Sequence, residues 1–428
     1  MTISRRGFLA GAAAAVVGLE SRRAAATPAP NHIYTAASIV GSPVSRAIHV
    51  YVRAASNGLV RLQGWSGPAV GAPRAVTGWR STGALGVAKL WLPLPMDQPI
   101  TYRAQLQAST GGSILSAPLQ TLAPLVSDPV TFAYGSCQLV PSSGFIGSAK
   151  AIARAATKNP MFFAMIGDMG YGDHTTYVGA ANQFGRFMAL PDVQTILRRT
   201  YFIGMQDDHD YGLDDQYGAQ YRSHPEGRRA YIDLVPGTRS LSGPAYRSWR
   251  IGEVLFCLLD CRWYSDPKQG PYENGAWRSM LGRTQREWLY QTVESQQARV
   301  NVILSPVSFN SPDVVYPYGN AERSEIATRL SQAPGTTIIC GGDIHASNYG
   351  RGPGRLHTFT ACPLYQNVHH RPRFTESLWS EGGVGGITPA EQGFDVFGHI
   401  SIDTTAGAMR LRVIEDNGTV RFATTVPV

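Results

Sequence analysis

The stretch Met161-Phe162-Phe163-Ala164-Met165-Ile166-Gly167-Asp168 joins an apolar run to a carboxylate that directly follows it. Six consecutive apolar residues predict a strand buried on both faces, as in a sheet covered by helices. In open α/β sheets, ligands collect at the carboxyl ends of the strands. Asp168 is therefore a candidate site residue, and Tyr171 follows it three positions later.

The same arrangement recurs at three other places in the chain. Cys137 follows an apolar run at 130–134, Asp208 and His209 follow one at 201–205, and Asp343 and His345 follow one at 336–339. A lone Gly-Asp pair is usually a turn, and a lone cysteine is usually a small buried hydrophobe. The inference therefore depends on the combination, which predicts that four strand ends converge on one crevice.

The residues from 127 to 428 predict an α/β domain. Further strands are expected at 254–259 and 300–304, and a helix at 148–157. Thr284-Gln285-Arg286-Glu287 has the pattern of a capping box that opens a helix running towards Gln297. The last seventy residues return to strands, with a hairpin turn at Asp416-Asn417-Gly418.

Residues 27–126 predict a separate β-sandwich of the fibronectin-III-like kind. Short, partly alternating runs at 47–52, 58–62 and 100–104 are divided by Gly, Pro and Ser, which is typical of such a fold. The stretch from Leu122 to Pro129 contains two prolines and is expected to be the boundary. No catalytic constellation lies in this segment, so we expect a structural or substrate-positioning module.

Residues 1–26 predict a twin-arginine (Tat) signal peptide. Ser4-Arg5-Arg6-Gly7-Phe8-Leu9 is followed by an apolar stretch and by the small residues Ala24-Ala25-Ala26. An ordinary Sec signal is the alternative, whereas the apolar stretch is too short to span a bilayer. We expect the Tat translocase as a partner during export, and a periplasmic or secreted mature protein.

Charge and cysteine content limit the classes of partner. Removing the signal lowers the formal net charge from +8 to +5, a balance that suits an anionic substrate. No Lys- or Arg-rich run marks a nucleic-acid reader, no later segment is apolar enough to span a membrane, and we expect a monomer. Apart from Cys137, the cysteines allow zero, one or two disulfides: Cys257, Cys261, Cys340 and Cys362.

The strand-end residues together provide the ligands of a two-metal hydrolytic site. A thiolate from Cys137, a tyrosinate from Tyr171 and an imidazole from His345 would join Asp168 around one metal, a set that suits Fe(III). Asp168, Asp208 and Asp343 would hold the second metal. An all-oxygen set favours a hard cation, with Ca(II) or Mn(II) ahead of Zn(II).

Three further residues are candidates for the reaction, in which a metal-activated hydroxide would attack a phosphate ester. His209 would donate a hydrogen bond or a proton to an oxygen of the substrate. Asp210 could fix the tautomer of His209, and Arg262, which follows another strand, could bind the phosphate as a bidentate donor. The alternative for Arg262 is a solvated strand end.

At these residues the chain resembles the alkaline phosphatase D family, a branch of the metallophosphoesterases related to purple acid phosphatases. The resemblance covers about residues 30–428. The matching elements are Tyr134-Gly135-Ser136-Cys137-Gln138, Gly167-Asp168 with Tyr171, Asp207 to Gly212, Leu259-Asp260-Cys261-Arg262, Gly282 with Gln285 and Trp288-Leu289, and Gly342 to Ala346.

The resemblance implies an αββα sandwich with ligands at strand ends, and phosphomonoesterase or phosphodiesterase activity. It implies one iron, held by Cys137, Asp168, Tyr171 and His345, with one or two calcium ions nearby. The family commonly has Asn shortly after its Asp-Asp-His element, where this chain has Asp214 and Asp215. Asp214 is accordingly expected as a charged calcium ligand. Met169-Gly170 also departs from the bulkier pair often seen before the tyrosine.

Two alternatives remain open at this point. One is a strict phosphodiesterase that acts on phospholipid, teichoic acid or nucleic acid. The other belongs to a different class: an exported polymer-binding protein whose metal site has decayed.

Overall fold

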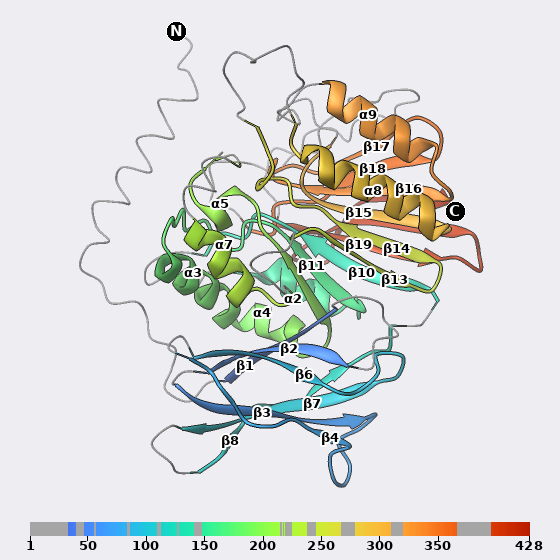
Figure 1. Cartoon of the computed structure of the whole chain (residues 1–428). Coiled ribbons are helices and arrows are strands. Elements are labelled where there is room, and N and C mark those ends of the chain that lie inside the picture. The colour runs from blue at the N-terminus through green and yellow to red at the C-terminus, as the bar shows by residue number, and fades with distance from the viewer. Residues whose placement is uncertain are drawn as a thin grey trace.

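The computed structural model describes residues 33–39, 47–54, 57–83, 86–108, 113–125, 128–140, 148–214, 216, 218, 225–237, 245–266, 279–309, 320–365 and 395–428. The expected signal peptide and the expected domain boundaries at 26/27 and 126/127 lie outside the described residues. The strands belong to four sheets, two from the N-terminal part of the chain and two from the rest (Figure 1).

The N-terminal part forms two antiparallel sheets. One contains β1 (Ile33–Ser38), β2 (Ile48–Ala54) and β6 (Val87–Leu92); the other contains β4 (Ala75–Val76), β3 (Gly58–Ser66), β7 (Ile100–Ala108) and β8 (Leu115–Ser116), with β5 (Arg80–Ser81) on β3 and β9 (Gln120–Leu122) on β7. Val60 and Leu62 are buried, whereas Leu59 before them is exposed and Arg61 between them is half-buried, which is the period of two expected of strands with one buried face. An independent fibronectin-III-like domain here stays a prediction.

The two sheets of the remaining part have six strands each. The first has the order β12 (Tyr201–Met205), β11 (Phe162–Ile166), β10 (Val130–Gly135), β19 (Val396–Asp403), β20 (Ala408–Glu415) and β21 (Val420–Pro427). The second has the order β13 (Arg247–Ile251), β14 (Val254–Leu258), β15 (Val300–Val307), β16 (Thr336–Gly342), β18 (Leu356–Thr360) and β17 (Asn348–Arg351). Because β10, β11 and β12 are parallel, as are β14, β15, β16 and β18, their carboxyl ends lie at one edge of each sheet.

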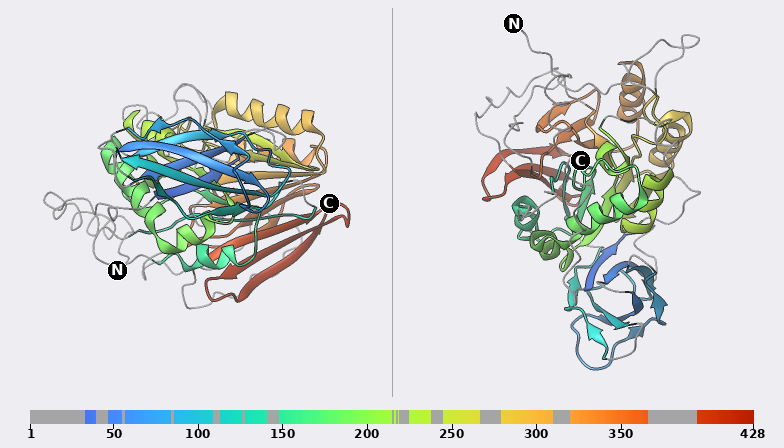
Figure 2. Two further views of the ribbon diagram at one scale, coloured as in Figure 1. Left: turned by 90° about the horizontal axis from the view of Figure 1, so that it is seen from below. Right: turned by 90° about the vertical axis from the view of Figure 1, so that its left-hand side faces the viewer.

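Helices cover the outer faces of these two sheets, so the layers are helix, sheet, sheet, helix (Figures 1 and 2). On one side lie α2 (Lys150–Ala156), α3 (Tyr177–Ala189), α4 (Pro191–Leu197) and α7 (Pro225–Leu234). On the other side lie α8 (Gly282–Gln296) and α9 (Asn320–Ser331), and the short α5 (Asp208–Tyr211) sits beside the strand ends. This arrangement agrees with the predicted α/β class.

The core explains why the strands are apolar throughout. Along β14, Phe256 faces the first sheet, whereas Leu255 and Cys257 belong to the cluster beneath α8 and α9. Phe256 packs edge-on against Phe162 of the first sheet, with ring centroids 5.2 Å apart. A strand that contacts a sheet on one face and helices on the other needs hydrophobic residues at every position.

Several sequence expectations can be compared with these elements. The predicted strands and the hairpin turn at 416–418 are confirmed, but the predicted capping box is wrong. The helix α8 begins at Gly282, two residues before Thr284, and Glu287 forms an ion pair with Arg283 on the helix surface. All five cysteines are buried free thiols, so the described chain contains no disulfide. Among the described helices, none has the length and apolar character needed to cross a membrane.

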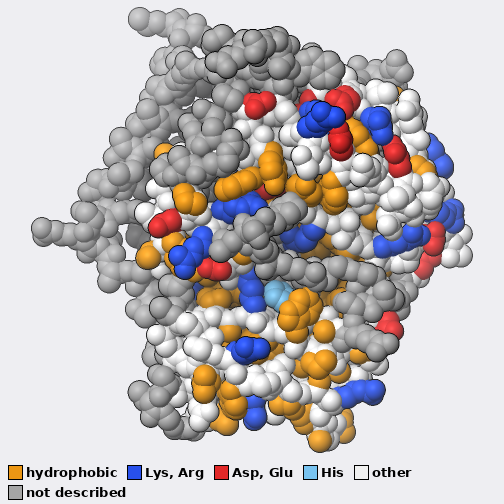
Figure 3. Space-filling model, viewed as in Figure 1, with side chains coloured by type: hydrophobic (Ala, Val, Ile, Leu, Met, Phe, Trp, Pro, Cys, Tyr) orange, Lys and Arg blue, Asp and Glu red, His pale blue; other side chains and the backbone are white. Residues whose placement is uncertain are grey.

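The surface of the N-terminal sheets carries scattered apolar side chains. Hydrophobic residues are frequent on the lower part of the face shown in Figure 3, where these sheets lie. Leu59, Val76 and Leu115 are among the exposed ones. Exposed apolar residues are common on soluble proteins, and these do not by themselves identify a binding site.

Two basic side chains of the sheet formed by β1, β2 and β6 contact helices α3 and α7. Lys89 of β6 donates hydrogen bonds to the backbone carbonyls of Ile232 and Val235 at the end of α7, the latter at 3.0 Å. Arg53 of β2 donates to the carbonyl of Ala181 in α3 at 3.1 Å. Lys89 thereby satisfies backbone carbonyls at the C-terminal end of α7. Together, Arg53 and Lys89 hold α3 and α7 against the sheet.

The burial of Lys89 leads to a prediction about stability and pH. Burial lowers the pKa of Lys89 from 10.5 to about 7. Between pH 7 and 9 the unfolded chain keeps a proton that the folded chain loses, so the folded state gains stability as the pH rises. We expect Lys89 to contribute about 1–2 kcal/mol to this rise, and Lys89→Met to lack it, in urea unfolding at both pH values.

The matched control for this prediction is Lys150→Met, because Lys150 is exposed on α2. It should leave the change between pH 7 and pH 9 as in the parent protein. An equal change in the parent and in Lys89→Met would contradict the burial of the ammonium group.

Candidate metal centre

Four strand ends present their side chains to one place. Cys137 follows β10, Asp168 follows β11, Asp208 follows β12, and Asp343 and His345 follow β16. The expectation that these motifs lie close together is therefore supported by the geometry described below.

The backbone at these residues is unusual. Non-glycine residues at the site have positive φ angles, a conformation that costs of order 1–3 kcal/mol each and is typical of functional sites. The residues and their φ angles are Cys137 (60°), Asp168 (58°), Tyr171 (55°), Asp173 (48°), Asp343 (72°) and His345 (49°). Gly167 has a φ of 118°, and a Cβ there would lie 2.6 Å from the Cβ of Asp207. The glycine of the Gly-Asp motif is thus required by both conformation and space.

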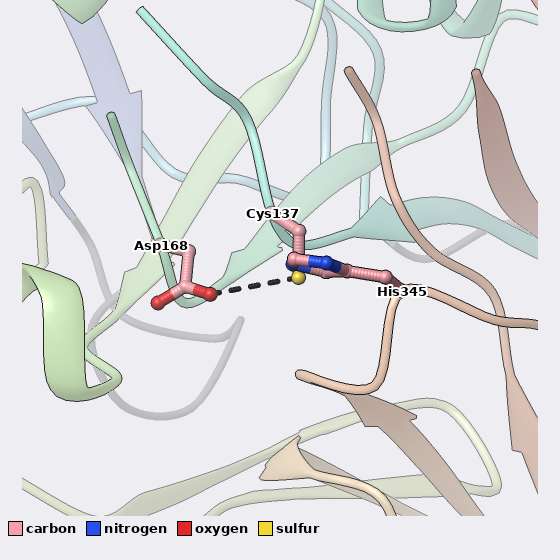
Figure 4. Close-up of side chains that lie close together, drawn as sticks. All are labelled: Cys137, Asp168 and His345. Carbon is pink, nitrogen blue, oxygen red and sulfur yellow. Dashed lines mark hydrogen bonds between the residues drawn. The ribbon is translucent and has the colours of Figure 1, made fainter. Parts of the chain in front are cut away.

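The first group of side chains contains Cys137, Asp168, Tyr171 and His345. The Sγ of Cys137 lies 3.5 Å from Oδ2 of Asp168, and both residues are buried (Figure 4). The hydroxyl of Tyr171 lies 3.0 Å from the same carboxylate oxygen and 2.7 Å from Nε2 of His345. A thiol, a carboxylate, a phenol and an imidazole therefore point into one small volume.

The second group contains three carboxylates that lie beside the first. Ligand atoms of Asp207, Asp208 and Asp343 lie within 4.8 Å of one another, as do those of Asp168, Asp208 and His209. Asp168 and Asp208 therefore connect the two groups. Asp207 was not among the predicted ligands, although it precedes Asp208 in the same motif.

The residues fit metal ions. Oδ1 of Asp168 and Oδ2 of Asp207 are buried and have no hydrogen-bond partner among the described residues. A buried carboxylate oxygen without a donor is costly unless a cation is near. The soft and aromatic donors of the first group suit a transition metal, and the oxygen donors of the second suit a hard cation.

The electrostatics indicate the same need for positive charge. Burial, followed by the charges of Cys137 and Asp208, raises the pKa of Asp168 well above its usual range. Burial also raises the pKa of Asp207, although Arg262 opposes this effect. Carboxyl groups crowded in this way retain protons unless cations replace them.

His209 has a different partner from the one expected. Its Nδ1 lies 2.6 Å from Oδ1 of Asp173, and its ring packs on Tyr171 with centroids 4.2 Å apart. Burial alone would lower the pKa of His209, but the charge of Asp208 and the hydrogen bond to Asp173 raise it to about 10. The imidazole is thus kept protonated and able to donate.

Asp210, which was predicted to orient His209, instead organises the backbone. Its carboxylate accepts hydrogen bonds from the amides of Asp168 and Met169, each at 2.7 Å, and from the amide of Asp207 at 3.0 Å. Asp207 and Asp210 form a capping box on α5. The prediction for Asp210 is therefore corrected: this residue joins the loops after β11 and β12.

Asp214 does not lie with the other expected ligands. Its side chain is 60% exposed and its Oδ1 lies 3.6 Å from Nε2 of His209. In the described part of the chain it belongs to neither group of clustered ligands. The assignment of Asp214 as a calcium ligand stays a prediction.

Arg262 lies in the acidic group and is only 3% exposed. Its guanidinium forms an ion pair with Asp207 and lies 3.3 Å from Asp208 and 3.2 Å from Asp343. Arg262 is therefore buried among carboxylates. Its role as a bidentate phosphate donor stays a prediction. Gln285 of α8 supports the segment by bonding both the amide and the carbonyl of Asp260 at 2.8 Å.

Comparison with known proteins extends this picture. Residues 182–352 match the family model of the PhoD-like phosphatases, a segment that includes Asp208, His209, Arg262, Asp343 and His345. No significant match is found among curated protein sequences. The matched segment does not reach Cys137, Asp168 or Tyr171, which the structure brings to the same site.

Solved structures share the fold over nearly the whole chain. The structure of PhoD is 14% identical and has a TM-score of 0.69, with 95% of this chain and 94% of that chain covered. A purple acid phosphatase from yellow lupin (Lupinus luteus) seeds is 11% identical and has a TM-score of 0.63, with 93% and 75% covered. At such identities the likeness to solved structures establishes the fold alone. The similarity to phosphatases rests on the family model that matches residues 182–352. Residues 182–352 are thus similar to the PhoD-like phosphatases, and the chain shares the fold of PhoD, which together support a hydrolase of phosphoric ester bonds.

Proposed function

We propose that the chain is an exported phosphoesterase that uses one Fe(III) and one or two Ca(II) ions. The observation that carries the proposal is the convergence of Cys137, Asp168, Tyr171 and His345, whose donor atoms lie 2.7–3.5 Å from one another in the measured pairs. A set with a thiol and a phenol favours a ferric ion. Two adjacent groups joined by Asp168 match a two-metal arrangement.

Each group would hold a different ion. Cys137, Asp168, Tyr171 and His345 would hold iron, while Asp168, Asp208 and Asp343 would hold calcium, with manganese or zinc as replacements. Asp207 is a further candidate in the second group. When bound, the metals would supply Lewis acidity towards the phosphate and lower the pKa of water.

The protein side chains then have separate tasks. Protonated His209 would donate to an oxygen of the phosphate ester, and Asp173 would keep its ring in place and charged. Asp210 would hold the loops that carry Asp168 and His209 in register. Arg262 would balance part of the negative charge of Asp207, Asp208 and Asp343.

The proposal of export rests on the sequence of residues 1–26, with its twin arginines and small-residue cleavage site. We propose that the mature protein acts in the periplasm or outside the cell as a monomer. The Tat route carries folded proteins, which would allow metals to be loaded before export.

The direct test compares a chromogenic phosphomonoester with its matching diester, using natively exported protein with calcium present. We expect hydrolysis, and we expect Asp168→Asn to lower kcat on the order of 10³-fold or more, because Asp168 belongs to both groups. Asp97→Asn, a change of an exposed carboxylate, is the control and should retain full activity.

The outcomes separate the alternatives. Faster cleavage of the monoester supports a general phosphatase, whereas cleavage of the diester alone supports a strict phosphodiesterase for phospholipid, teichoic acid or nucleic acid. Metal-loaded protein that cleaves neither ester would contradict the proposal and favour a polymer-binding protein.

Tyr171 generates a prediction about colour. A tyrosinate bound to a ferric ion absorbs visible light, so the natively purified protein should be coloured and Tyr171→Phe should lose the band. Tyr177→Phe is the matched control, because the hydroxyl of Tyr177 donates to Asp233 at 2.9 Å, away from the metal ligands. A colourless, iron-free preparation with full activity would refute the assignment of Tyr171 to iron.

Asp173 generates a prediction about the pH profile. Since Asp173 raises the pKa of His209, Asp173→Asn should lower that pKa, and the protonated donor should be lost at a lower pH. We expect the alkaline limb of the kcat profile to move to lower pH and kcat to fall by about 10- to 100-fold. If the limb stays in place while kcat falls, Asp173 does not act through His209.

A further inference from the structure

A pocket lies beside His209, which is one of its lining residues. Its walls come from α3, from α7, and from the segments after β11 and β12, and its cavity volume is about 30 Å³. Phe184 and Leu234 contribute apolar surface. His209 lines the pocket and also has a ring nitrogen within 4.8 Å of ligand atoms of Asp168 and Asp208, so the pocket adjoins the metal centre.

Two amide side chains line this pocket without complete partners. Nε2 of Gln183 and Oε1 of Gln206 are buried and have no hydrogen-bond partner among the described residues. The side chains are 5% and 2% exposed, respectively. Oε1 of Gln183 accepts a hydrogen bond from Arg186. Because a guanidinium group contains donors only, the orientation of the amide is fixed and Nε2 is a donor.

Two glycines leave the space that the side chain of Gln183 occupies. A Cβ on Gly170 would lie 1.6 Å from Nε2 of Gln183, and a Cβ on Gly172 would lie 2.9 Å from its Cγ. Gly170 also has a φ of 135°, which side chains other than glycine rarely adopt.

Leaving a buried donor and a buried acceptor unpaired costs about 1–3 kcal/mol for each group. The open mouth and the neighbouring His209 indicate what could pair with them. A ligand that satisfies both amides must carry both a donor and an acceptor, as a hydroxyl group does. Among the described residues no lysine or arginine lines the pocket, and the carboxylate of Asp210 does, so a second anionic group is disfavoured there.

We propose that this pocket binds the alcohol portion of the phosphate ester, and that it selects a small neutral alcohol carrying a second hydroxyl group. The proposal rests on the proposed function. In the hydrolysis, water forms a bond to phosphorus, the bond from phosphorus to the ester oxygen breaks, and that oxygen takes the proton that His209 donates. One proton of the water stays on the phosphate, the other passes to solvent, and His209 regains a proton from solvent. The departing alcohol would lie beside His209, which lines the pocket.

The test compares 2-hydroxyethyl phosphate with ethyl phosphate on the metal-loaded, full-length mature protein. These esters differ by one hydroxyl group. We expect kcat/KM to be at least about tenfold higher for 2-hydroxyethyl phosphate, because ethyl phosphate leaves the two amides unpaired. Gln183→Leu and Gln206→Leu should each bring this ratio close to one, by lowering kcat/KM for 2-hydroxyethyl phosphate.

Gln194→Leu is the matched control, because this buried glutamine of α4 donates to the carbonyl of Met188 and does not line the pocket. It should keep the tenfold preference. A preference lost equally in this control would contradict a specific role for the pocket.

The outcomes distinguish failure of the pocket from failure of the function. If both esters are cleaved at equal kcat/KM by the unaltered protein, only water fills the pocket and the proposal is wrong, whether or not the variants fold. If neither ester is cleaved while the metals are bound, the proposed function fails and the pocket proposal fails with it.

Discussion

Crowding of buried negative charge at four strand ends is the constraint on which the rest of this structure depends. Carboxylate oxygens of Asp207, Asp208 and Asp343 lie within 4.8 Å of one another, and Cys137 and Asp168 lie directly beside them. In a buried site such charges repel strongly unless cations are present. One arginine, Arg262, supplies a single positive charge to this cluster. The site therefore requires further cations, and the two ligand groups show where they would bind.

The fold provides the rigidity that this crowding demands. The parallel strands are apolar on both faces and are covered by a second sheet and by helices, so their ends are fixed. Left-handed backbone at Asp168 and His345 then turns the ligands inward at a cost that the packed strands can support. Farther out, Arg53 and Lys89 hold α3 and α7, the helices that form the walls of the pocket beside His209. The N-terminal sheets thus support the helices that line this pocket.

The sequence could predict the strand ends because long apolar runs have one plausible structure, and a polar residue directly after each run falls at the sheet edge. Cys137, Asp168, Asp208, Asp343 and His345 were found in this way, and the structure brings them together. The partner of His209 could not be found, because Asp173 lies in an irregular segment 36 residues away in the chain. Adjacent Asp210 was the obvious choice, but its carboxylate satisfies backbone amides instead.

Most of the other differences between prediction and structure have the same cause: contacts between distant segments leave no local pattern in the sequence. The capping pattern at Thr284 failed because Gly282, with a φ of 69°, allows the helix to begin earlier. The burial of Arg262 depends on three carboxylates from two distant segments, which periodicity along one strand cannot reveal. Gln183 and Gln206 have no local pattern that marks them as pocket residues. A possible signal was Gly170, since a glycine next to a site often marks close approach of another group.

The central claim is that two adjacent ligand groups bind two different metals, and anomalous diffraction from crystals of the natively exported protein tests it most directly. Data collected on both sides of the iron absorption edge should place iron among Cys137, Asp168, Tyr171 and His345. A second, lighter ion should lie among Asp168, Asp208 and Asp343, so that Asp168 contacts both. A single ion, or ions bound away from Asp168, would contradict the account.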